Sequence, residues 1–234
     1  ASLQFTAEGV IGIQGFLSLH APTVKHVSFK DMLKEEYKQE DAEAFAALGS
    51  AFQTSTHLET LNLSDNAISS SMWENWSNHT GLRQLILDYV RMDDSSVVEL
   101  HRNFTFCDSL EELYIVLTNK LGSRGLAAAN SILTRCNKLS SLRWAVKEAP
   151  PDAVLPWFGL AEMAAKQSGG SRVGSHLIHL VMDGGSISVD ELGERGLCGA
   201  LPYCTRLRSL KLRSIGIKDE GIDLMVSAFL QSKP

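Results

Sequence analysis

The cysteines are the first residues of this chain whose type and spacing could indicate a chemical role. Three of them stand three residues before the leucine that opens a repeated motif, and these are Cys107, Cys136 and Cys204. A thiol at a position shared by several units is typical of a small buried group, and the paired C-x-x-C spacing of zinc sites is absent. We predict free, reduced thiols, with Cys198 on a helix face. A metal site or a Cys107–Cys136 disulfide is the alternative, because neighbouring strands lie roughly 4.8 Å apart.

His176 and His179 have an H-x-x-H spacing, which joins two imidazoles on one face of a helix. The surrounding residues read as a strand, in which residues three apart point to opposite faces. We therefore predict that His179 lies on the exposed face of a sheet and His176 in the turn before it. No metal site follows from this pair.

Motifs for catalysis are missing from the sequence. The glycine pairs at 169–170 and 184–185 are isolated and lack the spacing of phosphate-binding loops. No G-x-S-x-G elbow and no H-E-x-x-H motif occurs. We predict no catalytic residues, no cofactor, no metal and no small-molecule substrate, so the chain is not expected to be an enzyme.

Charge and composition narrow the class of partner. The net charge of -5 and the pI near 5.8 count against nucleic acid as the main ligand, and no apolar run is long enough to span a membrane. Four N-x-[ST] sequons would indicate secretion if they carried glycans, at Asn62, Asn75, Asn78 and Asn103. Asn62 falls inside an expected strand, and the first residues do not form a signal peptide. Together with the unpaired cysteines, this favours an intracellular, reducing compartment, the cytoplasm.

A leucine repeat must position all of these residues. The stretch Leu58 to Asn66 reads L-x-x-L-x-L-x-x-N, and we call its three leucines the first, second and third core positions. Six further segments fit the same template, with first core positions 24 to 38 residues apart. The seven triplets are Val24-Val27-Phe29, Leu58-Leu61-Leu63, Leu82-Leu85-Leu87, Leu110-Leu113-Ile115, Leu139-Leu142-Trp144, Leu177-Leu180-Met182 and Leu207-Leu210-Leu212. A repeat of this kind predicts one short strand and one helix or turn per unit.

Apolar spacing between the triplets predicts the second half of each unit. Helices are expected over 7–17, 41–52, 125–136, 157–166 and 219–230. Segment 145–175 is the longest interruption, because Pro-Pro and Gly-Gly pairs punctuate it. We predict one segment over 1–234, with about seven full repeats, partial repeats at both ends and an irregular insertion at 145–175.

Units of this length with a true helix, as in 207–230, resemble the ribonuclease-inhibitor-like class of leucine-rich repeats. That class includes ribonuclease inhibitor, the sensor domains of NOD-like receptors, the Ran GTPase-activating protein and tropomodulin. The resemblance implies an α/β solenoid, a curved horseshoe with a parallel sheet on its concave face and helices on its convex face. It also implies a protein-binding role. The asparagine that follows the third core position at Asn66 is missing from the other repeats, which departs from the consensus.

Positions between the core leucines should form rows on the concave face, and one group of them combines apolar anchors with charge. Such a mixture is what a protein-binding hot spot requires. The predicted partner-binding residues are Ile86, Asp88, Glu111, Glu112, Tyr114, Val116, Arg143, His179, Lys211 and Arg213. The leading hypothesis is a non-catalytic scaffold that binds another protein. The alternative is a GTPase regulator like the Ran GTPase-activating protein, and a minor alternative is RNA bound at the basic C-terminal edge.

Overall fold

Seven strands form one parallel sheet whose spatial order follows the sequence, β1-β2-β3-β4-β5-β6-β7. The computed structural model describes residues 7–20, 23–31, 39–53, 55–74, 76, 81–105, 107–146, 157–167, 175–183, 192–193 and 196–231. The strands are β1 His26–Ser28, β2 Thr60–Asn62, β3 Gln84–Val90, β4 Glu112–Leu117, β5 Ser141–Val146, β6 His179–Asp183 and β7 Ser209–Arg213. Each contains the second core position of one predicted repeat, so the predicted ladder is confirmed.

The register of the ladder places equivalent residues side by side. The second core positions pair directly from strand to strand, in the order Val27, Leu61, Leu85, Leu113, Leu142, Leu180 and Leu210. Because side chains alternate along a strand, the same register stacks the intervening polar residues in rows on the opposite face. This is why the sequence pattern predicts neighbours in space.

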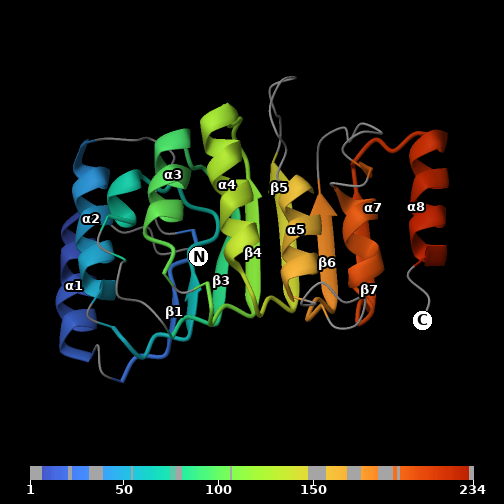
Figure 1. Cartoon of the computed structure of the whole chain (residues 1–234). Helices are drawn as coiled ribbons and strands as arrows, with labels where there is room; N and C mark the ends of the chain where they lie inside the picture. Colours follow the sequence, from blue (N-terminus) through green and yellow to red (C-terminus); the bar gives the residue numbers. More distant parts are fainter. Residues whose placement is uncertain are drawn as a thin grey trace.

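Helices cover one face of the sheet (Figure 1). They are α1 Ala7–His20, α2 Gln39–Gln53, α3 Asp94–Arg102, α4 Ser123–Arg135, α5 Trp157–Gln167, α7 Leu197–Ala200 and α8 Asp219–Gln231, with short 3-10 turns η1 Ser70–Met72 and η2 Leu201–Tyr203. The helices predicted from apolar spacing agree with α1, α2, α4, α5 and α8 to within a few residues at each end. The fold class is therefore mixed α/β with a parallel sheet, and the horseshoe curvature stays a prediction.

The core lies between the sheet and the helices and is built from the repeat leucines. Leu61, Leu85 and Leu113 are fully buried, and each buried leucine side chain contributes about 1.5–3 kcal/mol. Among its described residues, the second repeat has the short η1 turn where most other repeats have a longer helix. Two buried indoles, Trp73 and Trp76, fill that space with ring centroids 5.2 Å apart.

Two sequence predictions concern departures from the regular repeat. Trp144 replaces an aliphatic residue at a third core position and is buried as the pattern requires. Of the predicted insertion at 145–175, only the end of β5, helix α5 and residue 175 are described, and 147–156 and 168–174 lie outside the described residues.

Candidate partner-binding face

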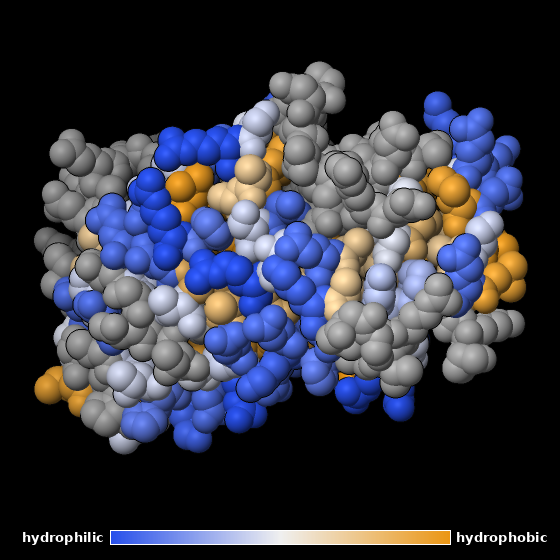
Figure 2. All heavy atoms as spheres, viewed as in Figure 1, coloured by the Kyte–Doolittle hydropathy of each residue, from blue (hydrophilic) through white to orange (hydrophobic). Residues whose placement is uncertain are grey.

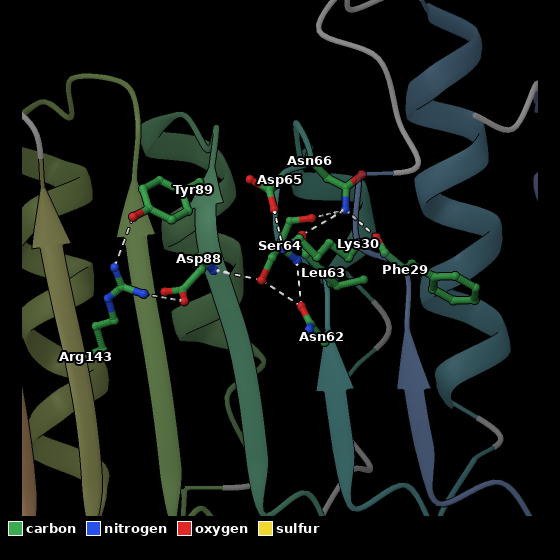
Figure 3. Close-up of polar contacts among 10 residues, drawn as sticks. All are labelled: Phe29, Lys30, Asn62, Leu63, Ser64, Asp65, Asn66, Asp88, Tyr89 and Arg143. Atoms are coloured by element: carbon green, nitrogen blue, oxygen red, sulfur yellow. Dashed lines mark hydrogen bonds and ion pairs between the residues drawn. The ribbon is translucent and has the colours of Figure 1, made fainter. Parts of the chain in front are cut away.

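The face of the sheet opposite the described helices, which we call the helix-free face, carries the predicted binding residues. The turns at the ends of its strands shape this face. In the second repeat the Nδ2 of Asn66 donates hydrogen bonds to the carbonyls of Phe29 at 2.6 Å, Leu63 at 2.9 Å and Ser64 at 3.0 Å (Figure 3). The asparagine side chain therefore satisfies backbone carbonyl groups where the chain leaves a strand. The buried amide also ties the first repeat to the second.

A left-handed backbone conformation recurs two residues after the third core position. It occurs at Asp31 (φ 56°), Asp65 (φ 60°), Tyr89 (φ 57°) and Ser214 (φ 53°). Asp tolerates this conformation better than most residues, whereas a bulky side chain adopts it at a cost of about 1–2 kcal/mol. Tyr89 is therefore the strained member of the series. Strained residues persist only where surrounding contacts hold them.

Contacts from Arg143 hold the exposed ring of Tyr89. Arg143 lies on β5, and its guanidinium carbon stands 5.4 Å from the centroid of the Tyr89 ring. Its Nη2 donates to the Tyr89 hydroxyl at 3.2 Å, and Tyr89 as a residue remains 51% exposed. The sheet thus presents an aromatic ring that is fixed in place but open to solvent.

Arg143 also joins two carboxylates from other strands. Its Nη1 donates to Asp88 on β3 at 2.7 Å, and its Nη2 lies 3.7 Å from Asp183 on β6 (Figure 3 shows Asp88 and Tyr89 beside it). Because β4 lies between β3 and β5, the Arg143 side chain crosses over β4 to reach Asp88. The side chains of Arg143 and Asp88 are only 19% and 18% exposed, so this ion pair is shielded from water.

Burial and charge set the ionisation of this cluster. Burial raises the pKa of Asp88, and the Arg143 guanidinium pulls it only part of the way back. Burial tends to lower the pKa of Arg143, but the Tyr89 hydroxyl and the Asp88 carboxylate outweigh it and raise that pKa. Arg143 therefore stays a fixed cation that organises three neighbours.

A second polar group lies beside the first, on β3, β4 and β5. Glu112 accepts hydrogen bonds from the Gln84 amide at 2.7 Å and from the Tyr114 hydroxyl at 3.1 Å. The Tyr114 hydroxyl also lies 3.1 Å from the hydroxyl of Ser141. Burial, followed by the charge of Glu112, raises the pKa of Tyr114 although the hydrogen bond with Ser141 opposes the shift. Tyr114 is half-buried and its hydroxyl is already engaged.

The structure brings some of the predicted binding residues together and leaves others apart. Asp88 with Arg143, and Glu112 with Tyr114, are brought together, whereas Ile86 is half-buried beside them on β3 and Glu111 is exposed and pairs with Arg83 at 3.4 Å. His179, Lys211 and Arg213 are exposed towards the C-terminal edge, and in the described part of the chain their side chains form no ion pair.

The prediction that Val116 is an exposed binding residue is wrong. It was expected as an exposed apolar anchor, but it is only 6% exposed. β4 pairs with β5 through Val116 and Ala145 to the end of both strands, and the Arg143 side chain crosses over this part of β4. A long side chain from the next strand therefore shields the position, which spacing within one strand does not reveal.

The cysteines and histidines show no metal chemistry in the described residues. Cys136 and Cys204 are buried, Cys107 and Cys198 are half-buried, and all four thiols are free. Burial raises the pKa of Cys204 to about 11, and burial also raises the pKa of Cys136. No group of three or more His, Cys, Asp or Glu side chains suited to a metal occurs where the structure is described. No helix in those ranges is both long and apolar enough to cross a membrane.

Sequence reasoning missed Tyr89 and Asp183 as parts of the site. The available signal for Tyr89 was its position two residues after a third core leucine, where Asp31 and Asp65 occur in other repeats. The exposure of Tyr89 follows from its place in the turn. The alternation of apolar and polar residues along the strand does not predict it. Asp183 stands directly after a third core position, in the same row as Asp88.

Comparisons with known proteins give structural neighbours only. No protein-family model matches the chain, and no curated protein matches it. Actin-binding site 2 of leiomodin-1 is a neighbour with a TM-score of 0.35 and 10% identity, covering 94% of this chain and 86% of leiomodin's. The C-terminal domain of tropomodulin from Caenorhabditis elegans has a TM-score of 0.29 and 11% identity, covering 97% of this chain and 93% of its own. Similarity at these TM-scores carries no inference about a partner.

Proposed function

We propose that the chain is a non-catalytic protein-binding module that captures a partner protein on the helix-free face of its sheet, around Tyr89 and Arg143. The observation that carries this proposal is the exposed Tyr89 ring held against the Arg143 guanidinium. Tyr and Arg are enriched among residues that dominate binding energy, and pre-ordered side chains lose less entropy when a partner docks. The concave shape expected for such repeats would place this cluster near the centre of the face.

Charge on this face favours specificity rather than catalysis. The Asp88 and Asp183 carboxylates lie against Arg143, and Glu112 accepts hydrogen bonds from Tyr114 and Gln84, so these three carboxylates each help to position a neighbouring side chain. The free thiols fit the reducing interior of a cell, which is where we propose that the partner is met. No specific observation favours GTPase regulation.

The test is capture of partners from a cell extract by the immobilised chain and by matched variants. Tyr89→Asn keeps a residue that accepts the left-handed backbone but removes the ring, and Tyr89→Phe keeps the ring but removes the hydroxyl. Partners of this face are expected to be lost with Tyr89→Asn and kept with Tyr89→Phe. Arg124→Ala, an exposed change on helix α4, is the control and should capture the same proteins. Equal capture by all variants contradicts the proposal.

A further inference from the structure

Glu112 lies in the middle of the helix-free face, because it is the first residue of β4 and β4 has three strands on each side. In the register of the sheet it stands between Gln84 of β3 and Ser141 of β5. Its Oε2 atom accepts two hydrogen bonds, one from the Gln84 side-chain amide at 2.7 Å and one from the Tyr114 hydroxyl at 3.1 Å. Two donors on one oxygen hold the carboxylate in a fixed orientation.

The second carboxylate oxygen of Glu112, Oε1, is open. It accepts no hydrogen bond from the described residues and it is not buried, so solvent reaches it. A group that is oriented before binding loses less conformational entropy when a partner pairs with it. Glu112 therefore presents a preorganised acceptor to a donor from outside the chain.

Charges on the central strands of this face do not balance. Strands β2 to β6 contain no lysine, and their charged residues are three carboxylates and one arginine, namely Asp88, Glu112, Asp183 and Arg143. The arginine pairs with both aspartates, and Arg83, directly before β3, pairs with Glu111. Within the described residues no cation pairs with Glu112. The carboxylate with the open oxygen is thus the one that lacks a counter-charge.

From these observations we propose that Glu112 receives a lysine or arginine side chain of the protein that binds the helix-free face, so that this face selects a basic segment. A hydrogen bond between an ionised donor and a carboxylate is about twice as strong as one between neutral groups. The inference rests on the proposed function, because it names the chemistry of the partner that this face captures.

The spacing along β3 sets the length of the segment. Gln84 is level with Glu112, and Tyr89 lies five positions further along the strand. Five positions correspond to about 17 Å at roughly 3.3 Å per residue. A stretch of about six extended residues therefore reaches from Glu112 to the exposed Tyr89 ring. Nucleic acid is a poor occupant, because its phosphates would bring further negative charge to a carboxylate without a cation.

The probe is a random heptapeptide library displayed on phage and selected on the immobilised chain. One recovered peptide is then synthesised with a fluorescent label. Its counterpart carries citrulline for each arginine and norleucine for each lysine, which removes the charge and keeps the length. In fluorescence anisotropy the basic peptide is expected to bind about tenfold more tightly than its counterpart. The difference should shrink as salt is added.

Glu112→Gln makes the test specific to this carboxylate. The amide oxygen can still accept from Gln84 and Tyr114, so the fold should be kept, and the tenfold preference should disappear. Glu162 of helix α5 is exposed on the helix-covered side of the molecule, where Figure 2 shows many hydrophilic residues. Glu162→Gln makes the same change in net charge and should keep the preference. Circular dichroism checks the fold of each variant.

Tyr89→Asn separates this inference from the proposed function. Binding that falls with Tyr89→Asn but not with Glu112→Gln would overturn the inference and leave the proposed function standing. Binding that needs Glu112 but not Tyr89 would support the inference and count only against Tyr89 as the centre of the site. Binding that neither variant changes would overturn both.

Four further results overturn the inference. They are a library that yields no peptide, recovered peptides without enrichment in lysine or arginine, displacement of the peptide by an equal concentration of spermidine, and dimers in light scattering that disappear in Glu112→Gln. Spermidine displacement would make the ligand a small polycation, and the dimers would make it a second copy of the chain. Loss of the preference in Glu112→Gln, with its retention in Glu162→Gln, supports the inference.

Discussion

The centre of the helix-free face and the C-terminal edge use the same residue types in opposite ways. At the centre, Arg143 is only 19% exposed and is engaged by Asp88, Asp183 and Tyr89. At the edge, Arg208 and Arg213 are exposed and are not in ion pairs within the described residues. The difference shows that the neighbouring strands determine whether an arginine side chain is fixed in ion pairs or left exposed. An arginine with strands on both sides is fixed by their side chains, whereas the arginines of β7, beside which the described residues place only β6, stay exposed.

The largest contrast is expected in the core beneath these two regions. Leu113→Ala on β4 removes a fully buried side chain flanked by strands on both sides, and should lower the free energy of unfolding by about 2–5 kcal/mol. Leu212→Ala on β7 removes a partly buried one beside an apolar groove that helix α8 also lines, and should cost about 1 kcal/mol. Urea denaturation of the two variants measures both. Equal losses would mean that the edge is covered.

The second contrast concerns the arginines themselves. Arg143→Met leaves the half-buried Asp88 carboxylate without its cation, and should lower the free energy of unfolding by about 1–3 kcal/mol. Arg213→Met should stay within about 0.5 kcal/mol of the parent chain, because the side chain is exposed and outside any ion pair among the described residues. Thermal denaturation of both variants at one pH gives the comparison. A loss with Arg213→Met as large as with Arg143→Met would contradict it.

The third test uses pH and two carboxylates with opposite shifts. Burial raises the pKa of Asp88 in the folded chain. Burial also acts to raise the pKa of Asp93, but hydrogen bonds from the Ser96 hydroxyl and backbone N–H outweigh it and lower that pKa. When the folded pKa is raised, the native state holds the proton more tightly, so stability falls as the pH rises from the unfolded pKa to the folded one. When the folded pKa is lowered, stability is present above the unfolded pKa and is lost as the pH falls through the folded pKa.

Measured against Asp88→Asn, the parent chain should therefore become relatively less stable as the pH rises through the range just above the ordinary aspartate pKa of about 3.9. Measured against Asp93→Asn, it should become relatively more stable as the pH rises through the range just below that value. Each change should be about 1 kcal/mol or less. Chemical denaturation from acid to neutral pH records both slopes, and slopes of the same sign would be the contrary result.

The smallest effect on the free energy of unfolding is expected from a substitution in helix α8. Ile222→Ser replaces a half-exposed side chain at the groove and should change the free energy of unfolding by no more than about 0.5 kcal/mol. Ile132→Ser in α4 is the matched change at a fully buried site, and it should be strongly destabilising. A stable Ile132→Ser would contradict the buried position of α4.

Much of the fold could be predicted because one spacing serves every strand. Leucines at the three core positions have to point the same way in each repeat, so Leu61, Leu85 and Leu113 come into register without further information. Helix α8 and helix α4 follow from apolar spacing alone. The polar rows also follow, which is why Asp88 and Arg143 were both expected on one face.

The remaining features of the site depend on long side chains that reach beyond the neighbouring strand. Arg143 crosses β4 to meet Asp88, which hides Val116 and fixes the Tyr89 ring. Spacing within a strand determines which face a residue occupies but not how far its side chain extends or which turn takes a left-handed backbone.

The amino-acid sequence by itself determined the ladder, its order and the face on which each polar row stands, because burying the leucines allows only one register. Only the tertiary structure decided which charges are satisfied, since that depends on distances between strands and on whether a strand has a neighbour. Arg143 and Arg213 are the same residue type on the same face. Arg143 is fixed within the sheet because β5 has a strand on both sides, whereas Arg213 is exposed on β7, beside which the described residues place only β6.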